Sequence, residues 1–462
     1  MATAGPIVMK FGGTSVADAD AIGRVVGIVK GARDSSGLPP VVIVSAMSGV
    51  TDRLLELTEA AERRRDAHVL NGVADLSRRH FEALERLLPP ESASDVLAEI
   101  AAHLDDLRAL LKATAILRSA SPSAHDAIVS SGELMNSRLL AAALQHGGVA
   151  TAWVDPRRAI VTDDAHTKAA PLADPTREAV AREILPRVAE GRVPVLGGFV
   201  GATVQGVTTT LGRGGSDYSA AIIGAALDAR EIQIWTDVDG MMTADPRIVS
   251  GPRVVPHLSF GEASELAYFG AKVLHPSTIL PAVAKDIPVR ILNSRRADGG
   301  GTRITADPPA ADRELAAVAC KRHVTMVEIT STRMLMAHGF LRRVFEVFER
   351  HRTAVDVVTT SEVSVSVTVD DDRHLAAIVE DLRAFAEVNV EADLAILCAV
   401  GDNLQRSPHC GARHRGARGV PGAHGLAGGI AAQRHHRPAR RGSGAGHGRA
   451  APGVLRVAPC AC

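Results

Sequence analysis

Cysteine and aromatic residues are scarce in this chain. Its 462 residues include five cysteines, two tryptophans, two tyrosines and nine phenylalanines. Cys320 and Cys398 stand alone in apolar surroundings, and the other three cysteines lie in the last 53 residues. This spacing excludes a disulfide framework and a zinc ligand set, so no residue is assigned to a metal site. We interpret Cys320 and Cys398 as small core residues.

Long hydrophobic runs are also absent. No apolar stretch approaches the length of a membrane span. Lys10 interrupts the only early apolar segment, so no secretory signal is expected. We therefore expect a cytoplasmic protein that makes no membrane contact, and its length predicts two or three domains.

Acidic residues are missing from the C-terminal part. From Asn403 onward there are ten arginines but no lysine, aspartate or glutamate, and the last aromatic residue is Phe385. Residues 1–402 carry 42 basic and 52 acidic side chains, a net charge of −10. The acidic body and the missing aromatic residues argue against a nucleic-acid-binding protein. Residues 404–462, rich in Arg, Gly, Ala and His, are predicted to be disordered. We interpret them as the product of a shifted reading frame; a basic nucleic-acid-binding tail is the alternative.

The chain lacks a Walker-type phosphate loop, because it contains no Gly-Lys pair. A different glycine-rich segment, Lys10-Phe11-Gly12-Gly13-Thr14-Ser15, follows the apolar run Ile7-Val8-Met9. A helical apolar period begins after it, and Ser15 with Asp18 is predicted to cap that helix. Glycine lets the backbone approach a ligand, and the N–H groups of a first helical turn attract anions. This pattern predicts a phosphate site beside Lys10; a tight turn with a surface lysine is the alternative.

Residues 7–300 alternate strand-like and helix-like segments, which predicts a mostly parallel sheet covered by helices. Ligands bind at the carboxyl ends of such strands, so the Gly-, Ser- and Thr-rich segments found there are expected to meet in one crevice. The predicted strands are residues 7–9, 41–44, 128–129, 193–196, 231–235 and 289–292. A helix is predicted from residue 134 to about residue 145.

Residues 54–120 are predicted to form a helical hairpin inserted into this domain, with a break at Pro89-Pro90 and a solvated, charged face. Gly299-Gly300-Gly301 marks a boundary, so we expect a first domain over residues 1–300, a linker over 301–324 and a module over 325–403. The module has the order β-α-β-β-α-β of a ferredoxin-like α+β fold. Its predicted elements are residues 325–330, 340–348, 355–359, 363–369, 373–386 and 391–400.

A second glycine-rich loop, Leu211-Gly212-Arg213-Gly214-Gly215-Ser216-Asp217, precedes a helix that runs to about residue 227. The guanidinium of Arg213 suits a carboxylate or a phosphate. Asp217 is a candidate for holding a lysine in place or binding a metal-bound water. The alternative is that Ser216 and Asp217 only cap the helix.

Three further positions are candidates for binding. Glu133, at the start of a predicted helix, suits a substrate ammonium or simply compensates the helix dipole. Thr236 and Asp237 follow a strand and, with Arg247, suit a nucleotide. Lys272 lies in Gly270-Ala271-Lys272-Val273-Leu274-His275-Pro276 and is a second active-site lysine or a surface lysine.

Together these motifs are more specific than any one of them. Lys-Phe-Gly-Gly-Thr-Ser-Val, Gly-Glu-Leu-Met, Gly-Arg-Gly-Gly-Ser-Asp-Tyr-Ser-Ala, Trp-Thr-Asp-Val-Asp-Gly and Gly-Ala-Lys-Val-Leu-His-Pro occur in the order seen in aspartate kinases. From residue 7 to about residue 403 the chain resembles an aspartokinase of the amino-acid-kinase fold. The module over residues 325–400 resembles the regulatory ACT domains of that family, and most of all those of its lysine-sensitive class.

The resemblance implies ATP-dependent phosphorylation of the β-carboxylate of L-aspartate, with ATP and Mg²⁺ as cofactors and lysine as the effector. It also implies a homodimer or a higher homo-oligomer. The implied catalytic residues are Lys10, Asp217 and Lys272. The implied phosphate-binding residues are Lys10, Gly12, Gly13, Thr14, Gly214 and Gly215. The implied aspartate-binding residues are Ser45, Thr51, Glu133, Arg213, Gly214, Gly215 and Ser216. The implied ATP-binding residues are Thr236, Asp237, Met242, Arg247, Lys272 and Val273. The implied effector-binding residues are Met334, Phe340, Leu341, Val355, Asp356, Thr360 and Glu362.

The chain departs from the family pattern at two places. Met242 stands where related sequences often have a tyrosine, although a methionine can still pack on a nucleotide ring. Past Asp402 the family continues into a second ACT domain, which residues 404–462 do not resemble, so we expect unpaired strand edges and weak inhibition by lysine. The alternatives to an aspartokinase are a kinase acting on glutamate or acetylglutamate, an inactive amino-acid-sensing subunit, and a nucleic-acid binder using the tail.

Overall fold

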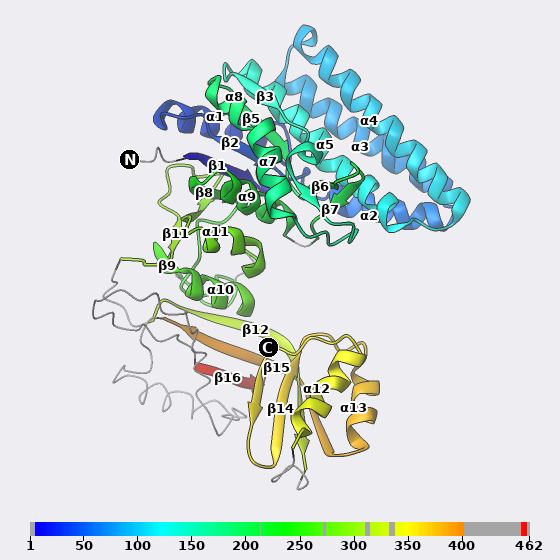
Figure 1. Cartoon of the computed structure of the whole chain (residues 1–462), viewed down its shortest axis with the longest axis vertical. Helices are drawn as coiled ribbons and strands as arrows, with labels where there is room; N and C mark the ends of the chain where they lie inside the picture. The colour runs from blue at the N-terminus through cyan, green and yellow to red at the C-terminus, as the bar shows by residue number, and fades with distance from the viewer. Residues whose placement is uncertain are drawn as a thin grey trace. The chain divides into compact units, whose positions relative to one another are not determined.

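The computed structural model describes residues 5–212, 214–270, 274–309, 315–331, 338–401 and 454–459. The chain divides into two compact units (Figure 1). The first contains Met1–Met241, Val254–Phe260 and Lys272–Pro309, and the second contains Met242–Arg253, Gly261–Ala271 and Ala310–Cys462. Two segments inside the predicted first domain thus pack with the second unit. Among the described residues no helix is long and apolar enough to cross a membrane.

An eight-stranded sheet forms the centre of the first unit, in the order β3-β5-β2-β1-β8-β10-β11-β9. The strands from β3 to β10 are parallel, which confirms the predicted parallel sheet, and β11 runs antiparallel to β10. β1 and β2 are almost wholly buried, as expected for strands covered on both faces. The strands are β1 Gly5–Phe11, β2 Val41–Val44, β3 Thr151–Trp153, β5 Val193–Gly197, β8 Ala229–Thr236, β9 His257–Ser259, β10 Val289–Asn293 and β11 Thr302–Thr305.

A short 3-10 helix, η1 Gly13–Val16, separates β1 from the first α-helix, α1 Ala19–Ser35. Asp18 caps α1, because its carboxylate accepts the N–H of Ala21 at 2.8 Å. The predicted cap at Ser15 is wrong: its hydroxyl donates to Trp235 O at 3.3 Å. The intervening 3-10 turn moves the start of the α-helix away from the glycines.

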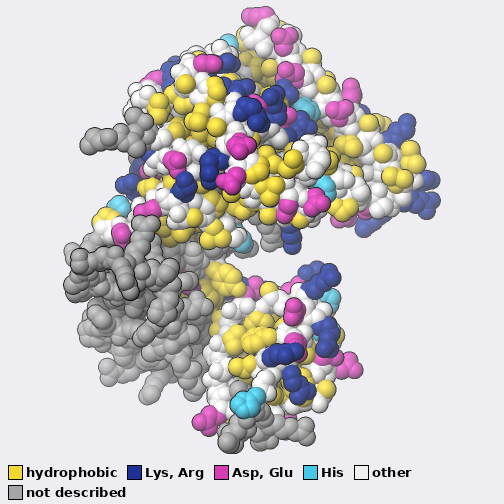
Figure 2. All heavy atoms as spheres, in the orientation of Figure 1, with side chains coloured by type: hydrophobic (Ala, Val, Ile, Leu, Met, Phe, Trp, Pro, Cys, Tyr) yellow, Lys and Arg dark blue, Asp and Glu magenta, His cyan; other side chains and the backbone are white. Residues whose placement is uncertain are grey.

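The predicted helical insert is a set of long packed helices rather than one hairpin (Figure 1). The break at Pro89-Pro90 is confirmed, because one helix ends at Leu87 and the next begins at Pro90. Figure 2 shows acidic and basic side chains interspersed on the visible face of the first unit, and ion pairs such as Arg78–Asp75 and Arg108–Asp105 lie on the insert. The helices are α2 Val50–Glu62, α3 Asp66–Leu87 and α4 Pro90–Leu117.

The predicted strand at residues 128–129 is wrong, because these residues lie inside a continuous helix, α5 Pro122–His146. Ser130 and Ser131 satisfy their hydroxyls by donating to Ala127 O, one turn earlier. A Cβ on Gly132 would lie 2.8 Å from the Cβ of Ala46, so this glycine permits close packing of α5 on the β2–α2 connection. The Ser-Ser-Gly sequence therefore reflects packing and not a turn.

The remaining elements of the first unit complete the cover of the sheet. A small three-stranded sheet has the order β4-β6-β7, and α9 packs on β1 and β8. These elements are α6 Pro156–Ala159, β4 Val161–Thr162, α7 Ala173–Glu183, α8 Leu185–Ala189, β6 Val200–Thr203, β7 Thr208–Thr210, α9 Gly215–Ala226, η2 Pro276–Ile279 and α11 Leu280–Ala284.

The second unit contains a five-stranded antiparallel sheet in the order β13-β14-β12-β15-β16. The predicted β-α-β-β-α-β order is confirmed, and Val344, Phe348 and Leu382 bring both helices into one core with the sheet. The strand predicted over residues 355–359 begins later, at Val358, so residues 355–357 lie outside it. The elements are α10 Phe260–Phe269, β12 Ala317–Thr330, α12 Phe340–Arg350, β13 Val358–Thr360, β14 Ser364–Val369, α13 Leu375–Arg383 and β15 Glu387–Val400.

One short segment near the C-terminus differs from the expected disorder. β16 Val454–Pro459 is a strand that pairs antiparallel with residues 394–399 of β15. An unpaired strand edge offers a row of backbone donors and acceptors to any extended segment, whatever its side chains. The expectation of an unpaired edge is therefore wrong for this part of β15.

Candidate active site

Backbone hydrogen bonds tie together the carboxyl ends of the central strands. They run from Gly12 N–H to Trp235 O at 3.0 Å, from Ser45 N–H to Phe11 O at 3.0 Å, from Gly198 N–H to Val44 O at 2.9 Å and from Ser294 N–H to Thr236 O at 2.8 Å. The connections that follow β1, β2, β5, β8 and β10 thus lie along one edge of the sheet. The sequence predicted this convergence from the topology of parallel strands.

Lys10 and Asp217 form an ion pair at this edge, with 2.7 Å between Nζ and Oδ1. Their side chains are only 10% and 14% exposed, so Lys10 is not a surface lysine. Lys10 is the second-last residue of β1, and Asp217 lies in the first turn of α9. The backbone of Gly214, and not the side chain of Ser216 or Asp217, forms the N-terminal cap of α9, so the capping alternative is wrong.

Two glycine-rich connections lie against neighbouring elements at this edge. A Cβ on Gly13 would lie 3.1 Å from Ala46 O, and one on Gly198 would lie 2.7 Å from the Cβ of Ser216. Gly214 has a φ of +69°, a left-handed conformation that favours glycine. Thr14 and Gly215 lie in η1 and at the start of α9. The backbone can therefore line the site closely on both sides of Lys10.

Glu133 is a buried carboxyl in the middle of α5, not at the start of a helix as predicted. Burial raises its pKa to about 8, although a hydrogen bond from the Ala46 backbone and the charge of Lys10 oppose this rise. Its Oε2 is buried without a hydrogen-bond partner among the described residues. A buried carboxyl in this state suits a cationic ligand group, because such a group would restore the charge and satisfy the free oxygen.

Asn136 was missed by the sequence analysis. It lies one turn beyond Glu133 on α5, is fully buried, and its Nδ2 donates to Ser45 O at 2.7 Å. Asn136 therefore holds the connection between β2 and α2, which begins with Ser45 and leads to Thr51 in the first turn of α2. The i, i+3 spacing from Glu133 was a signal for a shared helix face.

The connection after β8 is fixed to the end of β10. Thr236 is the last residue of β8, and the exposed Asp237 follows it. Asn293 donates from Nδ2 to Asp239 Oδ1 at 2.7 Å, and Ser294 Oγ donates to Thr236 O at 3.1 Å. Asn293 and Ser294 were not among the predicted site residues, because a strand end without glycine has no distinctive local signal.

Other predicted site residues lie elsewhere. Arg213, Lys272 and Val273 fall outside the described residues. Met242 and Arg247 belong to the second compact unit. The exposed guanidinium of Arg247 pairs with Asp245 at 2.7 Å, and this hydrogen bond lowers the pKa of Asp245.

Comparisons with known proteins match this geometry. The model of the Amino acid kinase family matches residues 5–293. The lysine-sensitive aspartokinase 3 of Escherichia coli is 39% identical over 416 residues, which cover 88% of each chain. The chain belongs to the amino acid kinase family, and within it to the aspartokinases. The chloroplastic aspartokinase 3 of Arabidopsis thaliana is 41% identical over 87% of this chain and 72% of its own.

A solved structure of this family resembles almost the whole chain. Escherichia coli aspartokinase III in complex with lysine and aspartate has a TM-score of 0.78 and 35% identity, over 98% of this chain and 96% of its own. The fold predicted from the resemblance, and the likeness to the lysine-sensitive class, are confirmed.

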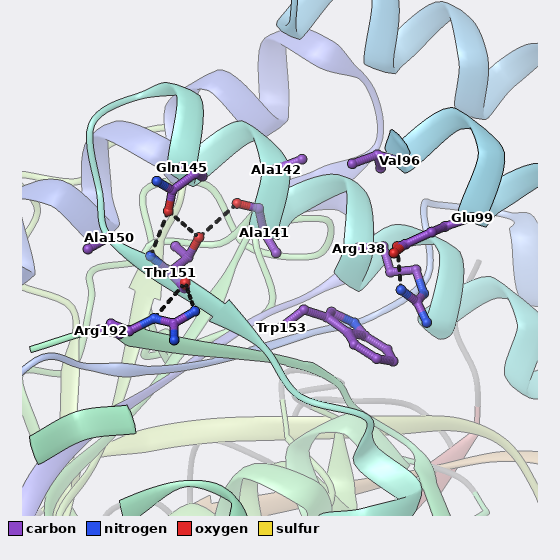
Figure 3. Close-up of a pocket in the computed structure, with 10 residues that line it drawn as sticks. All are labelled: Val96, Glu99, Arg138, Ala141, Ala142, Gln145, Ala150, Thr151, Trp153 and Arg192. Carbon is purple, nitrogen blue, oxygen red and sulfur yellow. Dashed lines mark hydrogen bonds and ion pairs between the residues drawn. The ribbon is translucent and has the colours of Figure 1, made fainter. Parts of the chain in front are cut away.

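A shallow hollow of about 500 Å³ lies apart from the predicted site residues, beside the edge strand β3 (Figure 3). Its polar side chains already have partners. Arg138 pairs with Glu99 and lies 3.6 Å from the centre of the Trp153 ring, and Arg192 donates to Thr151 O. Because these groups are satisfied within the chain, the hollow is not the candidate active site.

The predicted effector-binding residues occupy different environments in the second unit. Met334 falls outside the described residues. Phe340 and Val355 contribute to the core. Leu341, Thr360 and Glu362 are exposed, and Asp356 is the seventh member of the set.

Asp356 is engaged within its own unit. Its carboxylate accepts hydrogen bonds from the hydroxyl of Tyr268 and, at 2.8 Å, from the ammonium of Lys321. Lys321 also pairs with Asp370 at 2.6 Å. Burial raises the pKa of Asp370, whereas hydrogen bonds from Asp370 and Lys321 hold the pKa of Asp356 low despite its burial. An effector ammonium at Asp356 would therefore compete with Lys321.

Proposed function

We propose that this chain transfers the γ-phosphoryl group of ATP to the β-carboxylate of L-aspartate and forms 4-phospho-L-aspartate. This reaction opens the route to lysine, threonine and methionine. The observation that carries the proposal is the Lys10–Asp217 ion pair at the edge of the sheet. The buried carboxyl of Glu133 is close enough for the charge of Lys10 to affect its pKa. The names of the aspartokinase relatives support it.

The chemistry needs charge stabilisation more than proton transfer. A side-chain carboxyl with a pKa of about 4 is already ionised at neutral pH, so the attacking oxygen needs no general base. The difficulty is to bring two anions together and to stabilise charge spread over the transferring group. Lys10, Lys272 and the N–H groups of Gly13 and Gly214 serve this purpose. Gly12, Thr14 and Gly215 lie beside them, and the N–H groups of Gly12 and Gly215 bond within the chain. Asp217 orients Lys10.

The aspartate substrate offers an ammonium and an α-carboxylate for recognition. Glu133 binds the ammonium, because its partnerless Oε2 and raised pKa describe a site that lacks a cation. Arg213 binds the α-carboxylate through its two-pronged guanidinium. Ser45, Thr51 and Ser216 complete the pocket. Glutamate, which is one methylene longer, would place its side-chain carboxylate away from Lys10.

ATP binds beside the ends of β8 and β10, where Thr236 and Asp237 lie. Met242, Arg247, Lys272 and Val273 are proposed as further contacts on the family resemblance alone. The complex of Escherichia coli aspartokinase III with aspartate and ADP supports a nucleotide site in this fold. Magnesium prefers one or two carboxylates together with nucleotide phosphates. Asp217, which pairs with Lys10 through Oδ1, and the exposed Asp237 fit this requirement. The bound ion would neutralise phosphate charge.

We also propose that lysine regulates this activity. The likeness to a lysine-sensitive aspartokinase supports lysine as the effector. The family binds effectors where ACT domains pair between subunits, so a homodimer or larger homo-oligomer is proposed. We propose that inhibition is weak here, because residues 404–462 do not resemble the rest of a second ACT domain and Lys321 already occupies Asp356.

One coupled assay tests the proposal. ADP release is measured with purified protein, ATP and Mg²⁺, and with aspartate or glutamate as the acceptor; hydroxylamine then traps the acyl phosphate. We expect turnover with aspartate and at least about tenfold lower kcat/KM with glutamate, since a misplaced methylene costs about 1–3 kcal/mol. Preference for glutamate would replace the proposed substrate. No turnover with either acceptor, from folded protein, would favour the amino-acid-sensing subunit.

A further inference from the structure

A second carboxylate on α5, that of Asp126, is fully buried and has no role in the site described above. It accepts a hydrogen bond from the hydroxyl of Thr210 at 2.6 Å, from the N–H of Thr167 at 3.0 Å and from Nδ1 of His166 at 2.8 Å. Three donors thus converge on one carboxylate from two segments far away in the sequence. Bonds to an ionised acceptor are about twice as strong as neutral ones.

The first partner, Thr210, is the last residue of β7 and leads directly into the glycine-rich loop. Leu211 N–H donates to Phe199 O, and Gly215 N–H donates to Gly212 O, both at 3.0 Å. Gly215 begins α9, and Asp217 follows two residues later. Along the chain, Thr210 is thus seven residues from the carboxylate that pairs with Lys10, and backbone hydrogen bonds hold Leu211, Gly212 and Gly215 between them.

The second partner supports the same loop from its other side. Thr167 has a φ of +69°, a left-handed conformation that is costly for a threonine, and its N–H points to Asp126. A Cβ on Gly212 would lie 3.4 Å from Thr167 O and 3.4 Å from the Cγ of Lys168. Ala169 N–H donates to Thr210 O at 2.9 Å. Asp126 therefore holds both the chain that enters the loop and the segment on which Gly212 rests.

We propose that Asp126 is a positioning residue that sets the glycine-rich loop for aspartate. Asp126 and Glu133 lie seven residues apart on α5, which places them on nearly the same face two turns apart. One helix thus carries the group that binds the substrate ammonium and the group that fixes the loop for the rest of the substrate. This inference rests on the proposed function.

Kinetic measurements on Thr210 separate positioning from stability. Thr210→Val keeps the shape but loses the hydroxyl, whereas Thr210→Ser keeps the hydroxyl. We expect T210V and D126N to raise the KM for aspartate by about tenfold or more, the value of one charge-assisted hydrogen bond. The KM for ATP should change by less than about twofold, and T210S should resemble the parent. In the double variant D126N/T210V, the KM for aspartate should rise by less than the product of the two single effects, because both changes remove the same hydrogen bond.

The matched control is Thr176→Val. Thr176 is also a buried threonine of the first unit, and its hydroxyl bonds with the backbone of Val161. This change should lower stability without altering either KM. If T176V shifts the KM for aspartate as T210V does, or if T210V shifts both substrates equally, Asp126 is only structural and the inference is overturned.

Hydrogen–deuterium exchange provides a readout that does not depend on turnover. In the full chain without substrate, peptides covering the β7–α9 connection should exchange faster in T210V and D126N than in the parent and T176V. Unchanged exchange overturns the inference even if the chain phosphorylates aspartate. If exchange is faster in both variants but the parent shows no turnover with aspartate, the proposed function is contradicted. The anchoring of the loop by Asp126 would still be established.

Discussion

Each unit contains a largely buried lysine–aspartate pair of similar length, and the two pairs differ in what else surrounds the lysine. Lys10 and Asp217 are 2.7 Å apart, and Lys321 and Asp356 are 2.8 Å apart. Lys321 meets a second carboxylate, Asp370, and its ammonium lies 4.8 Å from the centre of the Tyr268 ring. Lys10 has one carboxylate partner, and the position of a Cβ on Gly12 lies 3.6 Å from its Nζ.

This difference shows that the length of an ion pair does not distinguish a structural lysine from one that binds a substrate. A lysine held by two carboxylates and an aromatic ring has its charge compensated, so it serves to hold elements together. A lysine held by one carboxylate beside glycines keeps a direction in which an anion can approach. We infer that Lys10 acts on the substrate and that Lys321 fastens α10 and β12 to Asp356.

The largest effect should come from Lys10→Ala. Removing one stabiliser of transition-state charge lowers kcat by about 100- to 1,000-fold. The fold should persist, because the ammonium lies at a strand end and not in the hydrophobic core. Kcat is measured in the coupled assay and folding by circular dichroism. Lys321→Met is the matched control and should keep kcat within about twofold; equal losses in both variants would erase the distinction between the pairs.

Glu133→Gln should have the next largest effect. Loss of one charged hydrogen bond to the substrate ammonium costs about 1.5–3 kcal/mol, or about 10- to 150-fold in kcat/KM for aspartate. KM for ATP should change less. An unchanged kcat/KM for aspartate would remove Glu133 from the aspartate site.

The same variant has a pH signature in the ligand-free protein. Burial raises the pKa of Glu133 from 4.5 to about 8, so the folded state retains a proton that the unfolded chain releases. The stabilisation is complete below pH 4.5 and is lost as the pH rises to 8, at most about 5 kcal/mol in all. E133Q should lack this decline. Urea unfolding of both proteins between pH 5 and 9 measures it, and parallel curves would contradict the raised pKa.

Lys321→Met should act on stability instead of turnover. It leaves the largely buried carboxylate of Asp356 without its main counter-charge, which costs about 1–3 kcal/mol for an unsatisfied polar group. The value is read from the midpoint of urea unfolding at neutral pH. A stability equal to that of the parent would show that Tyr268 alone holds Asp356.

The smallest effect should come from Asp370→Asn. The side chain of Asp370 is 50% exposed, so solvent screens its pairing with Lys321. We expect a loss of about 0.2–1 kcal/mol, as for an exposed ion pair. Urea unfolding at low and high salt measures this loss, which should shrink at high salt. A loss as large as that of K321M would mean that Asp370, not Asp356, is the main partner of Lys321.

Much of the architecture was predictable because it depends on local patterns. Short apolar runs predicted β1, β2 and β5 correctly, and alternating and helical periods predicted the β-α-β-β-α-β module of the second unit. Local patterns failed where packing overrode them. Ser130, Ser131 and Gly132 have the composition of a turn, yet Gly132 lies inside α5 because the helix packs closely on Ala46.

The sequence by itself determined the strands, the glycine-rich connections and the family resemblance, since each is written in neighbouring residues. Only the tertiary structure decided which charges meet. Lys10 finds Asp217 across more than 200 residues, Asp126 finds Thr210 across 84, and Lys321 finds Asp356 across 35. The burial of Glu133, and hence its raised pKa, depends likewise on the elements that surround α5. Electrostatic partners and burial depend on distances in space, which a one-dimensional pattern does not contain.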